Sequence, residues 1–229
     1  MGSLLPLAAV FFLSGYAVSA EGIRITDASG GLFFKPEVNR SFNYCWNIGA
    51  QGEVTFNQMV FVEGGLFLGE TGVFNSNVFA QAGVHLPIPV DMSLCVAYIF
   101  NSFSEYKSKI YTVTPKTVIR FRYGGFAVGY SMRMALYDDI LLPMEHGFLA
   151  LGYVNLYTSD QVTVRLTASN FHDFLVLTTG FYNLRVQFSV RVSRHITVIS
   201  GFEMYQAGSI GLSATPYGGA LTGGVVFSL

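Results

Sequence analysis

Apolar and polar residues alternate along most of this chain beyond residue 20. Residues 161–169 read Gln-Val-Thr-Val-Arg-Leu-Thr-Ala-Ser, and residues 93–100 place a large apolar side chain at every second position. Because successive side chains of a β-strand point to opposite faces, a period of two predicts strands with one apolar and one polar face. The pattern recurs in segment after segment, so the sequence predicts an all-β protein.

The composition indicates a membrane as the surroundings of this β-structure. Hydrophobic residues make up 51% of the chain and charged residues only 12%, about half of the roughly 25% usual in soluble domains. A membrane-spanning helix needs about 18 or more apolar residues. Only residues 1–20 and 207–229 come near that length, and the second segment contains Pro216 and six glycines, which disfavour a helix. The remaining structure that satisfies its backbone in lipid is a closed β-barrel.

Turn signals divide the chain into twelve predicted strands, with ten or eight as the alternatives. Short connections alternate with longer ones, as in outer-membrane barrels. An even number of strands places both termini on the periplasmic side. The predicted strands are residues 30–38, 41–56, 59–69, 76–86, 91–101, 112–122, 125–135, 146–157, 161–169, 174–191, 195–206 and 217–229.

The N-terminus has the pattern of an export signal. Residues 4–13 form an apolar core, and the small residues Val18, Ser19 and Ala20 follow it. This arrangement predicts a signal peptide over residues 1–20 and a single transmembrane barrel domain over residues 21–229. A buried N-terminal helix is the alternative interpretation.

The charged residues of the predicted strands fall on the face opposite the apolar one. Aromatic residues gather toward both ends of the apolar face, as at the two interfaces of a membrane, so we expect that face to contact lipid and the charged face to line the lumen. Seven positive residues then meet three negative ones. They line either a basic path that favours anionic solutes or a structural network in a plugged lumen. The lumen residues are Glu53, Glu63, Lys116, Arg120, Arg122, Arg133, Arg165, Arg185, Arg191 and Glu203.

The last strand carries a resemblance to a known class of proteins. Leu221, Gly223, Val225, Phe227 and Leu229 alternate up to the C-terminus. This pattern resembles the final strand of small Gram-negative-type outer-membrane β-barrel proteins, which usually ends in an aromatic residue; here the aromatic lies two positions earlier. OmpW-like and nucleoside-channel-like barrels are similar in size. The resemblance implies an outer-membrane location, contact with outer-membrane lipid, and recognition of the last strand by the barrel assembly machinery.

The sequence shows no pattern typical of an active site. The histidines have no metal-ligand spacing, and no nucleophile, phosphate-binding loop, metal site or cofactor site is predicted. Cys45 and Cys95 are predicted to be free residues of the lumen face, and the net charge of −1 gives no case for nucleic acid. We therefore expect a passive or weakly selective channel for small solutes rather than an enzyme. The alternative is a structural or surface-interaction barrel, adhesin-like, with a plugged lumen.

Overall fold

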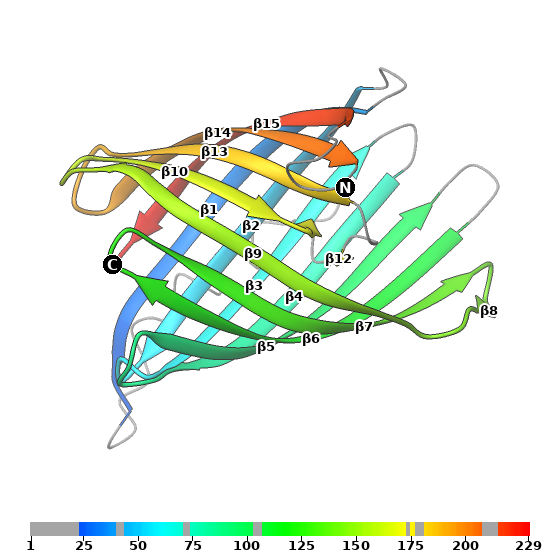
Figure 1. The fold of residues 1–229 in the computed structure, drawn as a ribbon, viewed down its shortest axis with the longest axis horizontal. Coiled ribbons are helices and arrows are strands. Elements are labelled where there is room, and N and C mark those ends of the chain that lie inside the picture. The colour runs from blue at the N-terminus through cyan, green and yellow to red at the C-terminus, as the bar shows by residue number, and fades with distance from the viewer. Residues whose placement is uncertain are drawn as a thin grey trace, which may run out of the picture.

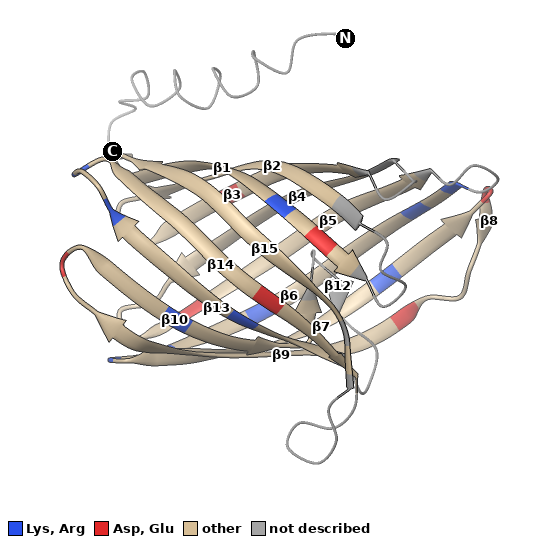
Figure 2. Ribbon diagram, turned by 90° about the horizontal axis from the view of Figure 1, so that it is seen from above, with Lys and Arg blue, Asp and Glu red and all other residues tan. Residues whose placement is uncertain are grey.

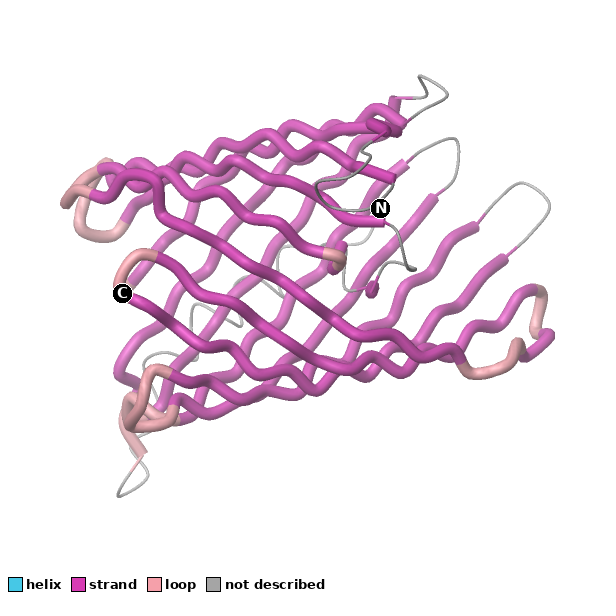
Figure 3. Tube along the Cα trace, in the orientation of Figure 1, coloured by secondary structure: helices cyan, strands magenta, loops and turns pink. Residues whose placement is uncertain are grey.

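A computed structural model describes residues 23–39, 44–70, 74–102, 107–172, 175–176, 181–207 and 215–229. Over these residues the chain consists of strands joined by turns and loops, as Figure 3 shows. None of the described segments forms an apolar helix long enough to span a membrane. The predicted signal peptide, residues 1–20, lies outside the described residues and stays a prediction.

Twelve long antiparallel strands form a closed barrel, which confirms the predicted fold (Figure 1). Three short strands accompany them in the described part of the chain: β8 (Ile140–Leu141), β11 (Phe171–His172) and β12 (Leu175–Val176). The wall strands are β1 (Ile25–Asn39), β2 (Tyr44–Phe56), β3 (Val60–Glu70), β4 (Phe74–His85), β5 (Val90–Ser102), β6 (Lys107–Phe121), β7 (Gly124–Tyr137), β9 (Glu145–Thr158), β10 (Val162–Ser169), β13 (Phe181–Arg191), β14 (Ile196–Ala207) and β15 (Thr215–Ser228).

The barrel closes between its first and last strands. Each wall strand pairs with the next wall strand along the chain, and β1 pairs antiparallel with β15, for example at Leu32 and Val225. Ile25 lies opposite Phe56, next to the tight turn after β2, and Ser228 lies opposite Ser29. The start of β1 and the end of β15 therefore both lie at the end of the barrel that has the short turns. The compartment that this end faces stays a prediction.

Within the predicted wall strand over residues 174–191, β13 covers Phe181–Arg191, and residues 174 and 177–180 lie outside the described residues. The prediction is wrong at Leu175–Val176, which form β12 and pair with β11 in a separate two-stranded sheet. The reason lies at Asn170, directly after β10. Its side-chain oxygen accepts the N–H of Ala150 at 2.7 Å, and its side-chain nitrogen donates to the carbonyl of Phe148 at 2.6 Å. The side-chain amide of Asn170 thus forms hydrogen bonds with β9 that the backbone of a neighbouring strand would otherwise form, as asparagine side chains do at turns. The chain then leaves the wall and forms the hairpin β11–β12, in which Phe171 pairs with Val176.

The two faces of the wall differ as predicted. Val96 is 43% exposed on the outside, whereas its neighbour Cys95 is 3% exposed on the inside. The predicted aromatic bands are exposed on the outside at Trp46, Phe121 and Phe188. Among the other predicted members, Phe42 and Phe174 lie outside the described residues. Further exposed apolar residues of the outer face include Leu32, Ile48, Val62, Val78, Leu94, Val128, Val198, Phe202 and Leu221.

Aromatic residues of the inner face lie directly opposite glycines of the neighbouring strand. Phe61 pairs with Gly83, and Phe67 pairs with Gly49. A Cβ atom built on Gly83 would come within 2.5 Å of the Phe61 ring, so the ring occupies the space that a larger residue would take. Three further pairs follow the same rule: Phe79 with Gly65, Phe33 with Gly224, and Tyr153 with Gly125. The rings therefore lie against the wall of the barrel.

We expect Gly83→Ala to destabilise the barrel by about 1–3 kcal/mol, as overpacking of a filled interior does. The new methyl group would meet both the Phe61 ring and the carbonyl oxygen of Met92, at 2.5 Å each. Urea unfolding of the refolded protein, followed by the gel mobility of unboiled samples, measures the change. Gly223→Ala is the matched control, because a Cβ atom there meets nothing within 4 Å. An equal loss in both variants would contradict the role of the aromatic–glycine pairs.

Val96→Arg tests the lipid-facing side of β5. Val96 lies near the middle of its strand on the outer face, where an arginine in a membrane barrel costs about 2–4 kcal/mol. Ser189→Arg on the inner face of β13 is the control, because its side chain points toward the lumen. The same unfolding measurement should show a much larger loss for Val96→Arg, and similar losses would mean that the outer face does not contact hydrocarbon.

Candidate functional site

Charged residues are sparse on the barrel wall and are separated by long stretches of other residues (Figure 2). Most of the charged residues predicted for the inner face lie on strands, where burial and contacts place them inward. They do not form one continuous lining. Within the described residues they fall into clusters of opposite charge on different parts of the wall and three arginines that form no ion pair, Arg122, Arg165 and Arg191.

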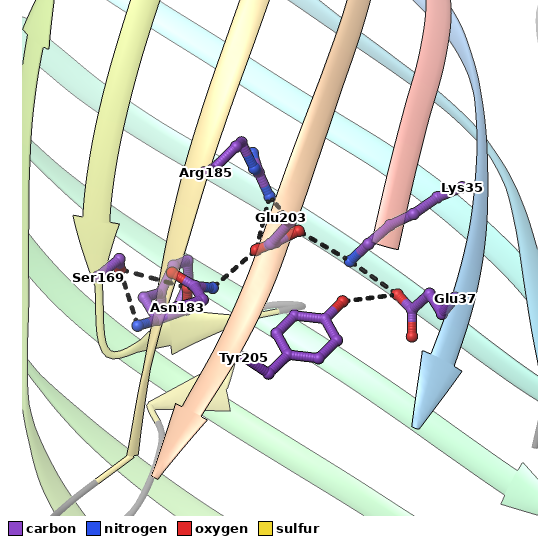
Figure 4. A network of polar contacts seen from close by, with 8 residues as sticks. Lys35, Glu37, Ser169, Asn183, Arg185, Glu203 and Tyr205 are labelled. Carbon is purple, nitrogen blue, oxygen red and sulfur yellow. Dashed lines mark hydrogen bonds and ion pairs between the residues drawn. The ribbon is translucent and has the colours of Figure 1, made fainter. Parts of the chain in front are cut away.

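The most buried charged group is Glu203 on β14, with no exposed surface. Its carboxylate accepts hydrogen bonds from Arg185 Nη2 at 3.1 and 3.2 Å and from Asn183 Nδ2 at 2.8 Å. Lys35 Nζ lies 3.3 Å from Glu203 Oε2 and 2.8 Å from Glu37 Oε1. The Tyr205 hydroxyl donates to Glu37 at 3.1 Å (Figure 4). Such dense pairing compensates the loss of water around a buried carboxylate.

The small residues of β15 allow this network to form. β15 lies between β14 and β1, and its Ala220 is paired with Glu203 on one side and with Glu37 on the other. Because Ala220 carries only a methyl group, the longer side chains of the two flanking strands meet above it. β15 is thus a strand of small residues across which the side chains of its two neighbouring strands make contact.

A second cluster lies at the short-turn end. His85 Nδ1 is 2.7 Å from Asp91 Oδ1, and Arg120 Nη2 is 3.0 Å from the same oxygen. The Phe61 ring stacks on His85 with a centroid distance of 4.8 Å. Arg120 is therefore on the inner face, as predicted, but it is held by a carboxylate that the sequence analysis did not count.

Three other predicted lumen residues are near one another. Glu53 and Glu63 are paired directly across β2 and β3, and Lys116 on β6 interacts electrostatically with both. Like charges in directly opposed positions of a sheet repel each other. Lys116 reduces this repulsion, so these residues form a mixed cluster rather than an acidic and a basic side far apart.

Unlike Arg120, Arg133 and Arg185, Arg165 forms no ion pair among the described residues. Its guanidinium lies 4.5 Å from the centre of the Tyr153 ring, and its Nε donates to Asn155 Oδ1 at 2.9 Å. Tyr153 in turn lies against Gly125, where a Cβ atom would come within 2.8 Å of the ring. A β-bulge sits beside Arg165 in the pairing of β9 with β10, and bulges redirect side chains. Gly125, the Tyr153 ring and the Arg165 guanidinium thus lie one above the other, from the barrel wall toward the lumen.

The remaining predicted residues lie toward the barrel ends. Arg133 pairs with Glu145 at 3.3 Å, where β7 meets the start of β9. Arg191 is the exposed last residue of β13. Arg122 lies in the turn after β6 rather than on a strand, because β6 ends at Phe121, and its guanidinium lies 5.1 Å from the Tyr123 ring centre.

The inner face carries acidic residues that the sequence analysis missed. Glu37, Asp91 and Glu145 each form an ion pair with a positive residue. Lys35 is a further missed cation. With these residues included, the surplus of positive charge on this face is smaller than the sequence suggests. Parity along each strand was sufficient to find Lys35 and Glu37.

Two buried apolar clusters lie on the inner face of β3 to β7, among buried polar residues such as Gln81 and Thr114. Phe79, Cys95 and Ala97 form one buried cluster with Phe67 against it, and Ile99, Ile110 and Ala135 form a second. Cys95 is a free cysteine of the inner face, as predicted; the side chain of Cys45 is not described. The described residues hold no group of three or more His, Cys, Asp or Glu that could bind a metal ion.

The hairpin β11–β12 is fastened to the inner wall beside the Glu203 network. The carbonyl oxygen of Phe171 accepts hydrogen bonds from Asn183 Nδ2 at 3.2 Å and from the Ser169 hydroxyl at 3.3 Å (Figure 4). Ser169 also accepts the N–H of Phe171 at 2.8 Å. The same Asn183 therefore holds both the hairpin and Glu203, and it connects the charged cluster to a segment that has left the wall.

Glu203→Gln should destabilise the barrel by about 3 kcal/mol, because removing one member of a buried ion pair leaves the others without compensation. Unfolding in urea measures the loss. Glu145→Gln is the control: that carboxylate is 57% exposed, and exposed pairs contribute at most about 1 kcal/mol. Similar losses in the two variants would show that the Glu203 network is not a stabilising centre of the inner wall.

Comparison with known proteins supports the architecture. No protein-family profile matches the chain, and no curated protein matches it in sequence. Among solved structures, the NanC porin superposes with a TM-score of 0.54 at 12% identity, over 89% of this chain and 99% of that one. An outer-membrane channel from Pseudomonas putida F1 gives a TM-score of 0.54 at 8% identity, over 93% and 100% of the two chains. The chain therefore has the fold of a small outer-membrane β-barrel.

Proposed function

We propose that this protein is an outer-membrane channel for small solutes with a weak preference for anions. The closed barrel with its apolar outer face supports a membrane location. The solved structures of similar fold include a porin and an outer-membrane channel, which supports a channel rather than an enzyme. Export by a signal peptide at residues 1–20, and recognition of the last strand by the barrel assembly machinery, belong to the same proposal.

The anion preference rests on the way charges are layered on the inner wall. In the Arg185–Glu203 pair the arginine side chain is 41% exposed and the carboxylate is fully buried. In the Arg120–Asp91 pair the corresponding values are 43% and 13%. In these two pairs solutes in the lumen meet the guanidinium group before the carboxylate, although each pair as a whole is neutral. In the Arg133–Glu145 pair toward the barrel end the order is reversed, with the two side chains 25% and 57% exposed. Exposed guanidinium groups attract carboxylates and phosphates and form paired hydrogen bonds with them.

Arg165 contributes most to this preference, since no acidic partner offsets its charge. Tyr153 and Asn155 hold its guanidinium in one orientation, so little side-chain freedom is lost when an anion binds. The ion pairs elsewhere on the wall weaken the overall field. Together these features support a weakly selective channel rather than a strongly anionic one.

The second candidate function is a structural or surface-interaction barrel whose lumen is closed. The two buried apolar clusters on the inner face of β3 to β7 and the hairpin β11–β12 fastened to the inner wall favour it. The two candidates differ in one measurement, the conductance of the refolded protein in a planar bilayer. Absence of conductance would favour the closed barrel.

Arg165→Gln tests the anion preference directly. In a salt gradient the wild-type channel should show a reversal potential of the sign that anion preference requires. The variant should move that potential toward zero with little change in stability, because it leaves no buried carboxylate unpaired. Arg194→Gln is the control: it removes the same charge from the exposed turn after β13, where salt screens it over about 8 Å. A cation-selective wild type, or equal shifts in the two variants, would contradict the assignment.

A further inference from the structure

Apolar side chains are exposed on the connection between β7 and β9. Ile140 is 68% exposed, Leu141 60% and Met144 55%. Leu142 lies among them and is also exposed. A cluster of large apolar side chains at the end of a barrel is costly in water, and exposed patches of this kind mark contact surfaces.

The connection is an ordered hairpin. β7 runs on to Tyr137, and β8 folds back so that Leu136 pairs with Leu141. Asp138 and Asp139 form the turn with φ of 47° and 65°, the positive values that a two-residue hairpin turn of the primed type requires. The Lys107 N–H donates to Asp138 Oδ1 at 2.9 Å. These contacts fix the hairpin to β6.

The exposed residues continue the outer face of the barrel. The outward side chains of β7 run from Phe126 to Leu136, a stretch of eleven residues, which is about the length of a tilted strand that spans the hydrocarbon core. Leu136 lies opposite both Lys109 on β6 and Leu141 on β8. Leu141 is therefore at the level of a charged residue, at the edge of the apolar belt and in line with it.

Two lysines mark this level as the polar boundary of the membrane. Lys109 Nζ is 2.8 Å from Asp139, and this contact lowers the pKa of the Asp139 carboxyl. Lys107 is exposed and forms no ion pair among the described residues. Lysines at the ends of membrane segments extend their ammonium groups toward lipid phosphates, so Lys107 is free to do so.

We propose that residues 140–144 form an interfacial anchor that inserts between the headgroups and acyl chains of the leaflet at the long-loop end. The inference rests on the membrane location in the proposed function. Lipid fits this surface because the patch continues the lipid-facing side of β7 rather than standing apart from it. The anchor would hold one side of the barrel at a defined depth in the leaflet.

Tryptophan fluorescence in lipid vesicles tests the anchor. The chain has one tryptophan, Trp46, exposed on the outer face, so in the wild type it reports insertion of the barrel itself. The variant Trp46→Phe with Leu141→Trp reports the hairpin. Each protein is refolded into phosphatidylcholine vesicles whose acyl chains carry bromine at shallow or deep positions. We expect a blue-shifted emission from Leu141→Trp and stronger quenching by shallow than by deep bromine.

The control is Trp46→Phe with Asp160→Trp, in the exposed polar turn before β10, which should stay red-shifted and unquenched. Quenching of Trp46 without quenching of Leu141→Trp would overturn the anchor and leave the membrane barrel intact. No quenching of Trp46 would overturn the membrane location itself. A blue-shifted but unquenched Leu141→Trp would mean that protein, either a second copy or another chain, covers the hairpin, and this result also overturns the proposal.

Discussion

The structure depends on closure of the backbone hydrogen-bond ladder between β1 and β15. A barrel in lipid has no water for unpaired amide and carbonyl groups, so the first and last strands must meet along their length. Their register runs from Ser29 with Ser228 to Asn39 with Gly218. The Glu203 network lies over this seam: its groups come from β13 and β14 on one side and from β1 on the other. Side-chain contacts thus tie together the strands that flank the point of closure.

A second constraint is the limited space inside a small barrel. Directly opposed aromatic and glycine residues, such as Phe67 and Gly49, let the rings lie along the wall instead of across the lumen. Three of these rings lie on β3 and β4, and the others lie on β1 and β9. The charged residues lie in separate groups, on β1, β13 and β14, on β2, β3 and β6, and toward the ends of the barrel. The inner surface therefore combines packed rings and apolar clusters with separate groups of charges.

The alternation of inward and outward side chains along each strand underlies both proposals, the anion preference inside the barrel and the membrane anchor outside it. Inside, buried carboxylates beneath exposed arginines favour contact with anions, and Arg165 is positioned without such a carboxylate. Outside, the apolar face continues onto the β7–β8 hairpin as far as Leu141. In both cases strand parity decides which side chains meet water or lipid, and register decides which of them meet one another.

The sequence alone determined the all-β class, the number of wall strands, the identity of the apolar outer face and most of the inward-facing charged residues. These features depend on the alternation of apolar and polar residues and on turn residues, both of which can be recognised from residues close together in the sequence. Tertiary structure decided which charges are paired, because Glu203 meets Lys35 only through the pairing of β15 with β1. It also decided that β13 begins at Phe181, since Asn170 ends β10 by bonding to β9, a strand earlier in the chain. Periodicity carries no information on register between distant strands, and the geometry of the candidate site is set by register.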